Sequence, residues 1–145
     1  MENGQDLFGL QRFVAAQDPV IDRVLQELKE GRKQSHWMWF VFPQLTGLGS
    51  SPMAQRYAIG SKEEAQAYFA HPVLGGRLLQ CTRLVNAFNG RTAHEIFGSP
   101  DDVKFRSSMT LFNIAVPDVP DFAKALAKYF GGDADLVTIE KLRVP

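Results

Sequence analysis

The fold is decided by Ser35-His36-Trp37-Met38-Trp39-Phe40-Val41-Phe42-Pro43-Gln44. Both tryptophans of the chain lie in this stretch, and residues 37–42 are consecutive large apolar side chains. On a helix such a run points in every direction around the axis, and on a strand it covers both faces. Neither arrangement leaves a face for solvent, so the rest of the chain is expected to pack around it. Ser35 as a helix N-cap and Pro43 as a stop favour a short buried helix, with a strand as the alternative.

The composition indicates one globular domain. A chain of 145 residues with 45% apolar residues can bury a substantial core. Sixteen basic residues balance sixteen acidic ones, so charge gives no general reason to bind nucleic acid or an anionic membrane. The single cysteine, Cys81, cannot form an internal disulfide, and no signal peptide or bilayer-length apolar run is present. We expect a soluble cytoplasmic protein with no membrane partner and no nucleic-acid partner. The oligomeric state is left open.

Capping residues and apolar stripes at helical spacing predict about eight short helices. The solvent-exposed end of the second helix is expected at Glu27, Glu30, Arg32 and Lys33. No repeat or linker divides the chain, so the predicted fold is all-α, a single domain over residues 1–145 with residues 1–5 flexible. The expected helix starts include Asp6, Asp18-Pro19, Ser51-Pro52, Ser61 with Glu64 as a capping box, His71-Pro72, Thr92 with Glu95 as a second capping box, and Ser99-Pro100.

Polar residues bracket the aromatic stretch and form a first candidate site. His36 can act as a general acid or base, or bind a phosphate when protonated. Trp37 or Trp39 can stack on a flat ring, although core packing is the default for so apolar a run. A histidine hydrogen-bonded to backbone is the structural alternative for His36. The supporting polar residues are Arg32, Lys33, Ser35 and Gln44.

A second polar concentration lies in the helix that follows Ser99-Pro100. Asp102, Arg106 and Thr110 step by four residues and share a face, an arrangement that can also be a plain surface ion pair. Serine and threonine are weak helix formers, and their crowding at positions where alanine would serve better indicates a functional site. The candidates are Asp102 as an acid or base, Lys104 and Arg106 as anion ligands, and Ser107, Ser108 and Thr110 as hydrogen-bonding groups.

The loop Gly47-Leu48-Gly49-Ser50-Ser51 precedes a helix start and can hold a phosphate with its backbone amides. Arg56 and Tyr57 then add a cation and an aromatic plane. The loop matches neither the P-loop nor the dinucleotide fingerprint, so an ordinary loop is the alternative. The histidines and Cys81 are scattered, so no metal site and no cofactor are expected, and Cys81 is interpreted as a core residue.

The sequence resembles domain-of-unknown-function family 1810, a bacterial family, over residues from about 7 to 142. The resemblance rests on Leu10-Gln11-Arg12-Phe13, Gly31 to Phe40, Phe42-Pro43-Gln44, Gly47-Leu48-Gly49, Tyr57-Ala58-Ile59, His71-Pro72-Val73-Leu74-Gly75, Lys104 and Ser107 to Phe112. It implies a mainly helical single domain and no particular activity. Members are sometimes labelled calpastatin, but a disordered inhibitor would be more polar and poorer in aromatic residues.

The order of two motifs along the chain also loosely resembles that of domains associated with NAD and ADP-ribose chemistry. This likeness rests on the early aromatic motif and on Gly98-Ser99-Pro100-Asp101-Asp102 before a late helix. The sequence departs from that pattern because residues 35–44 hold no glutamate. The leading hypothesis is a cleft between the 32–44 and 104–110 motifs that binds, and can hydrolyse, an anionic ring-containing molecule of nucleotide or ADP-ribose type. The competing hypothesis is a protein-interaction module whose aromatic residues serve only as its core.

Overall fold

The computed structural model describes residues 6–143, and its regular structure is helical throughout this range. The prediction of an all-α fold is confirmed, with ten helices in the described residues where about eight were expected. Several of the ten are only one or two turns long. They are α1 (Gln11–Gln17), α2 (Ile21–Lys29), α3 (Met38–Val41), α4 (Pro52–Arg56), α5 (Lys62–Ala70), α6 (Leu74–Ala87), α7 (Ala93–Phe97), α8 (Asp101–Ala115), α9 (Pro120–Phe130) and α10 (Leu136–Arg143). The expectation of flexibility at residues 1–5 falls outside the described range.

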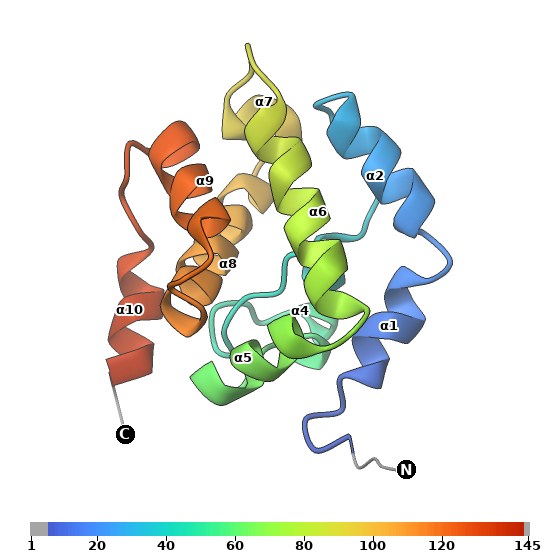
Figure 1. Cartoon of the computed structure of the whole chain (residues 1–145), viewed down its shortest axis with the longest axis vertical. Helices are drawn as coiled ribbons and strands as arrows, with labels where there is room; N and C mark the ends of the chain where they lie inside the picture. Colours follow the sequence, from blue (N-terminus) through green and yellow to red (C-terminus); the bar gives the residue numbers. More distant parts are fainter. Residues whose placement is uncertain (1–5, 144–145) are drawn as a thin grey trace.

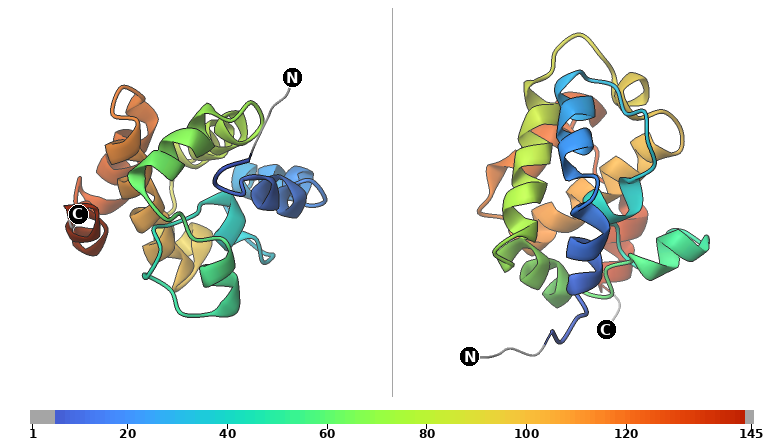
Figure 2. Two further views of the ribbon diagram at one scale, coloured as in Figure 1. Left: turned by 90° about the horizontal axis from the view of Figure 1, so that it is seen from below. Right: turned by 90° about the vertical axis from the view of Figure 1, so that its right-hand side faces the viewer.

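Two long helices, α6 and α8, organise the packing. Helix α6 packs against α2, α5 and α9, while α8 packs against α5, α7, α9 and α10. Figure 1 shows α6 between α2 on one side and the α8–α9 pair on the other, with α10 beside α8 at the edge of the molecule. Both views in Figure 2 show the segment between α2 and α5, drawn in cyan to green, as mostly irregular chain that contains the short helices α3 and α4. No helix among residues 6–143 has the length and apolar character needed to cross a membrane.

The aromatic stretch lies at the centre of one continuous hydrophobic core. It forms a single helical turn, α3, and Trp37 and Phe42 on either side of that turn are each 1% exposed. The ring of Phe42 meets Phe105 of α8 edge-on at 5.0 Å between centroids. The helical interpretation is therefore correct and the strand alternative is wrong. Ser35 does not cap this turn, because the N-cap position is Trp37 and no side chain caps it.

Three predicted helix starts carry the expected side-chain caps. The hydroxyls of Ser51, Ser61 and Thr92 each accept the amide N–H three residues later. Only Thr92 forms the complete capping box, because the Glu64 carboxylate accepts from the amide of Gly60 and not from Ser61.

Other predicted starts are displaced along the chain. Asp6 accepts hydrogen bonds from the amides of Leu10 and Gln11, so it supports α1 from outside the helix. Helix α2 begins at Ile21, and Asp18 pairs with Arg77 of α6 instead of capping it. Proline fixes only its own φ, so a single proline signal locates a helix start to within a few residues.

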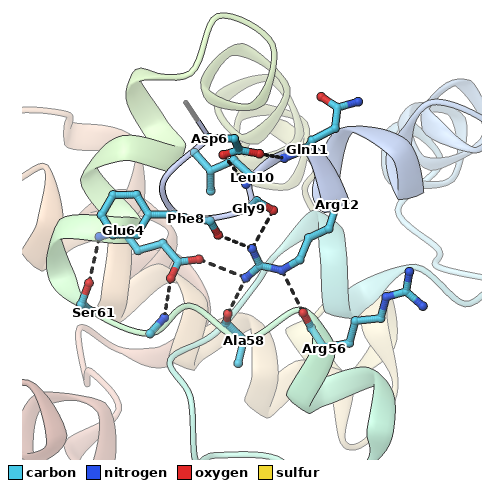
Figure 3. Close-up of polar contacts among 11 residues, drawn as sticks. Asp6, Phe8, Gly9, Leu10, Gln11, Arg12, Arg56, Ala58, Ser61 and Glu64 are labelled. Carbon is cyan, nitrogen blue, oxygen red and sulfur yellow. Dashed lines mark hydrogen bonds and ion pairs between the residues drawn. The ribbon is translucent and has the colours of Figure 1, made fainter. Parts of the chain in front are cut away.

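Arg12 joins three separate segments of the chain, as Figure 3 shows. Its guanidinium donates to the carbonyls of Phe8 and Gly9 before α1, and to those of Arg56 at the end of α4 and Ala58 beyond it. It also pairs with the Glu64 carboxylate of α5 at 3.0 Å. A guanidinium has five N–H donors, so this arrangement uses its full donor capacity. The contact fixes the position of the loop between α4 and α5.

Candidate functional site

Glu27 is buried at the end of α2, where the sequence indicated a solvent-exposed surface. Its residue is 6% exposed, and its carboxylate accepts four hydrogen bonds. The donors are the amides of Gln34 and Ser35, the Ser35 hydroxyl and the indole N–H of Trp37. Burial raises the pKa of Glu27, but these hydrogen bonds outweigh it and hold the pKa below the ordinary value of 4.5. The prediction for Glu27 was wrong because the segment after α2 folds back over it.

This carboxylate determines the roles of two predicted ligand-binding residues. Ser35 donates to Glu27 Oε2 at 2.6 Å, and Trp37 donates to Oε1 at 2.9 Å from within the core. Trp37 is too deeply buried for a ligand to stack on its ring. Both side chains therefore shape the segment that leads into α3.

Ion pairs connect the two predicted polar motifs. Lys33 Nζ lies 2.9 Å from Asp101 Oδ2, while Lys104 Nζ lies 3.7 Å from Asp101 Oδ1. The Lys104 ammonium also lies over the ring of Trp39, 5.6 Å from its centroid. Two ammonium groups thus share one carboxylate, which leaves a local excess of one positive charge. The side chains of Lys33, Asp101 and Lys104 are each less than a quarter exposed, so this charge lies in a partly desolvated position.

A cavity of about 490 Å³ opens beside Lys104. Its walls come from three segments that are distant in sequence: the Gln44–Ser50 loop, the first turns of α8, and the start of α10. The volume is in the range of small-molecule sites. The lining residues are Gln44, Gly47, Leu48, Gly49, Ser50, Pro100, Val103, Lys104, Ser107, Asp135 and Val137. Three of them, Gln44, Lys104 and Ser107, are predicted site residues, and four others belong to the predicted glycine loop.

Glycines let the loop follow the wall of this cavity closely. Gly47 has φ +88°, a backbone conformation that other residues rarely adopt. At Gly49, a Cβ atom would lie 2.7 Å from the Cβ of Ala54 and 3.4 Å from the amide nitrogen of Gln44. A side chain at Gly49 would therefore clash with Ala54 and press on the side-chain amide of Gln44. Because glycine has no side chain, the Gln44 amide keeps its place at the cavity wall.

The remaining residues of the α8 motif act mostly within the protein. Arg106 donates to the carbonyls of Asp133 and Ala134, and the hydroxyl of Thr110 accepts the amide N–H of Asp135. These bonds hold the start of α10 against α8. The Ser108 hydroxyl is fully buried and has no hydrogen-bond partner within the described residues.

Both predicted catalytic residues lie outside the cavity lining. Asp102 faces α7, where its carboxylate lies 3.3 Å from His94 Nδ1. His36 and Arg32 are exposed in the segment between α2 and α3. Arg56 at the end of α4 is exposed, and Tyr57 is buried against Phe13 and Phe40. The structure therefore places none of these residues beside Lys104.

Sequence reasoning missed the α10 side of the cavity. Asp135 and Val137 were not among the predicted site residues, and neither was Val103, which is 57% exposed. Val103 directly precedes Lys104, but no pattern in the sequence indicates that Asp135 and Val137 lie on the same surface. Burial raises the pKa of the Cys81 thiol to about 12, which agrees with its predicted core role. No group of metal-ligating side chains occurs among residues 6–143.

The fold and this cavity define a small helical domain with a partly apolar, lysine-containing pocket. The model of the family "Protein of unknown function (DUF1810)" matches residues 7–142, so the chain belongs to that family. It is also similar to the conserved hypothetical protein Rv1873 from Mycobacterium tuberculosis, known from a crystal structure. The two are 58% identical with a TM-score of 0.95, over 97% of this chain and 100% of the other. A comparison with proteins of curated function gives no match. The looser likeness to NAD and ADP-ribose domains gains no support from these matches.

Proposed function

We propose that the cavity beside Lys104 binds an anionic, ring-containing small molecule of nucleotide or ADP-ribose type. The observation that carries this proposal is the pair of lysines, Lys33 and Lys104, that share the single carboxylate of Asp101. Lys104 shares that carboxylate with Lys33 and is partly desolvated, so its ammonium attracts an anion more strongly than a fully exposed lysine does. The cavity lining also holds the Asp135 carboxylate, so we expect the anion of the ligand to lie beside Lys104 and away from Asp135. The amide of Gln44 adds a neutral hydrogen-bonding group at the same wall.

Apolar walls support the ring part of the ligand. Val103 on α8, Val137 on α10 and Leu48 of the loop all line the cavity. Branched aliphatic side chains offer surfaces on which a flat ring can lie, and burying them against a ligand is favourable. The catalytic roles of His36 and Asp102 remain predictions, and binding does not depend on them.

A thermal-shift screen against AMP, ADP-ribose, NAD and the matching nucleosides tests the proposal. A ligand present at a hundredfold excess over its Kd adds about 2.7 kcal/mol to the stability. For a chain of this size we expect Tm to rise by roughly 5–11 °C. Nucleosides should give no shift, because they lack the anion that pairs with Lys104.

Matched variants locate the site. Lys104→Met keeps the length of the side chain and removes its charge, so we expect it to abolish the shift. Lys124→Met, on the exposed surface of α9 and outside the cavity lining, should preserve it. Loss of the shift in both variants, or in neither, would contradict the proposed site.

An exposed apolar surface favours a second candidate function, a protein-interaction module. Val103, Leu136 and Val137 are 57%, 77% and 53% exposed and belong to neighbouring parts of α8 and α10. Exposed apolar groups that lie together are typical of docking surfaces. This candidate predicts that none of the nucleotides shifts Tm, and that Val137→Lys weakens capture of a protein partner without loss of fold.

A further inference from the structure

A second cavity lies farther along the same loop and the same terminal helix. Its volume is about 630 Å³, and its walls come from Leu45 and Thr46 of the loop, from Lys141 and Leu142 of α10, and from residues 60–63 at the start of α5. The cavity beside Lys104 uses the next part of the loop and the opposite end of α10. Both cavities therefore lie between the same two chain segments, one after the other.

The side chain of Lys141 reaches from the second cavity to the first. Its ammonium lies 2.8 Å from the position that a Cβ atom would occupy on Gly47. Gly47 lines the first cavity and Lys141 lines the second, so this contact lies at their boundary. Lys141 is exposed, and the four-carbon stem of a lysine can change its rotamer without disturbing the backbone. The contact between the two cavities is therefore made by a movable side chain.

We infer that the two cavities are the halves of one groove, and that the ligand is an extended molecule whose central anion pairs with Lys141. This inference rests on the proposed function and names the ligand class within it: two ring-bearing groups joined by a diphosphate, as in ADP-ribose. One group lies beside Lys104 and the other beside the start of α5. The diphosphate crosses Gly47, where the absence of a side chain makes room for the Lys141 ammonium that meets the phosphate oxygens.

The charges along the groove fit this arrangement. Lys104 stands in the first half, Lys141 at the boundary and Lys62 in the second half. Asp135 and Glu63 also line the groove, one in each half. The Asp135 carboxylate accepts from the amide and the hydroxyl of Thr138, so it is engaged in capping α10. The boundary position thus contributes a cation, where a diphosphate needs one.

Calorimetric titration with AMP, ADP and ADP-ribose tests this inference. The three ligands share one nucleotide, the second adds a phosphate, and the third adds a further sugar. We expect ADP to bind about tenfold more tightly than AMP, because its second phosphate reaches Lys141. ADP-ribose should bind at least as tightly as ADP, since its second sugar enters the cavity beside α5.

Two substitutions separate the halves of the groove. Lys141→Met should weaken ADP and ADP-ribose by about tenfold while leaving AMP unchanged. Lys104→Met should weaken all three ligands, and Lys124→Met should weaken none. If AMP and ADP-ribose bind equally, or if Lys141→Met affects AMP as much as ADP-ribose, the extended groove is wrong and the proposed function stands. If none of the three ligands binds, both proposals are wrong.

Discussion

At the scale of single residues, Arg12 offers the sharpest test of what holds the α1, α4 and α5 segments together. Replacing it with lysine keeps the positive charge but leaves three N–H donors from one nitrogen, which cannot reach carbonyls on both sides. We expect Arg12→Lys to lower the free energy of unfolding by about 2–4 kcal/mol. Urea denaturation measures this. Arg23→Lys on the exposed face of α2 is the control and should change stability by less than about 0.5 kcal/mol.

Two adjacent glycines of α6 are expected to respond to alanine in opposite directions. A Cβ atom at Gly75 would lie 1.8 Å from the carbonyl oxygen of Phe69, so the turn between α5 and α6 would have to move. Gly76 has no atom within 4 Å of that position. Gly75→Ala should destabilise the protein by about 3 kcal/mol, and Gly76→Ala should stabilise it by about 0.5–1 kcal/mol. Tm values of the two variants that move in the same direction would contradict this account of α6 packing.

At the scale of elements, α9 holds the end of α6. The hydroxyl of Tyr129 donates its one proton to the carbonyl of Val85 and also lies 3.1 Å from the carbonyl oxygen of Phe88. The Lys128 ammonium lies 2.6 Å from each of the carbonyl oxygens of Asn86 and Phe88. The last carbonyls of a helix have no partners within it, so these groups complete the helix.

Removing the tyrosine hydroxyl tests this cap. Tyr129→Phe should cost about 1 kcal/mol and speed amide hydrogen exchange in the last turn of α6. Tyr57→Phe serves as the control, because within residues 6–143 the Tyr57 hydroxyl makes no hydrogen bond. A uniform change in exchange along all helices would show that the bond supports global stability and not the end of α6.

The helices themselves were largely predictable, because their signals are local. The threonine that caps α7 and the proline that opens α4 act within four residues of their own position. The position of Glu27 was not predictable in the same way. A glutamate near the end of a helix has the same sequence pattern whether it faces water or a returning chain, and the four donors that bury it come from the segment 34–37.

The candidate site was predictable only in part, for the same reason. Lys104, Ser107 and Gln44 were identified because they are polar residues beside apolar ones. Val137 and Asp135 belong to the cavity only because Arg106 and Thr110 hold the start of α10 against α8. That contact joins residues about 25 positions apart, and no pattern within either segment indicates the other. His36 had the most suggestive chemistry in the sequence, yet it lies outside the cavity.

At the scale of the whole molecule, the lowered pKa of Glu27 makes global stability depend on pH. When the pKa of a carboxyl is lower in the folded protein than in the unfolded chain, unfolding takes up protons in the interval between the two values. Stability therefore rises with pH across that interval and is lost as the pH falls through it. The pKa of Asp6 is lowered too, chiefly by its hydrogen bond from the amide of Gln11, so it acts in the same direction.

We therefore expect the free energy of unfolding to be nearly constant from pH 7 to 5 and to fall below the ordinary Glu27 value of 4.5. Glu27→Gln should remove part of this dependence. It should also cost about 1–2 kcal/mol at pH 7, because hydrogen bonds to a neutral amide oxygen are weaker than those to a carboxylate and the Ser35 hydroxyl must turn to accept from the NH₂. Urea denaturation of both proteins between pH 7 and 3 measures the two effects. Because Glu27 ties α2 to the segment entering the core, its protonation should weaken the single cooperative transition and not one local region. Parallel stability curves for the two proteins below pH 5 would show that the acid sensitivity has another source.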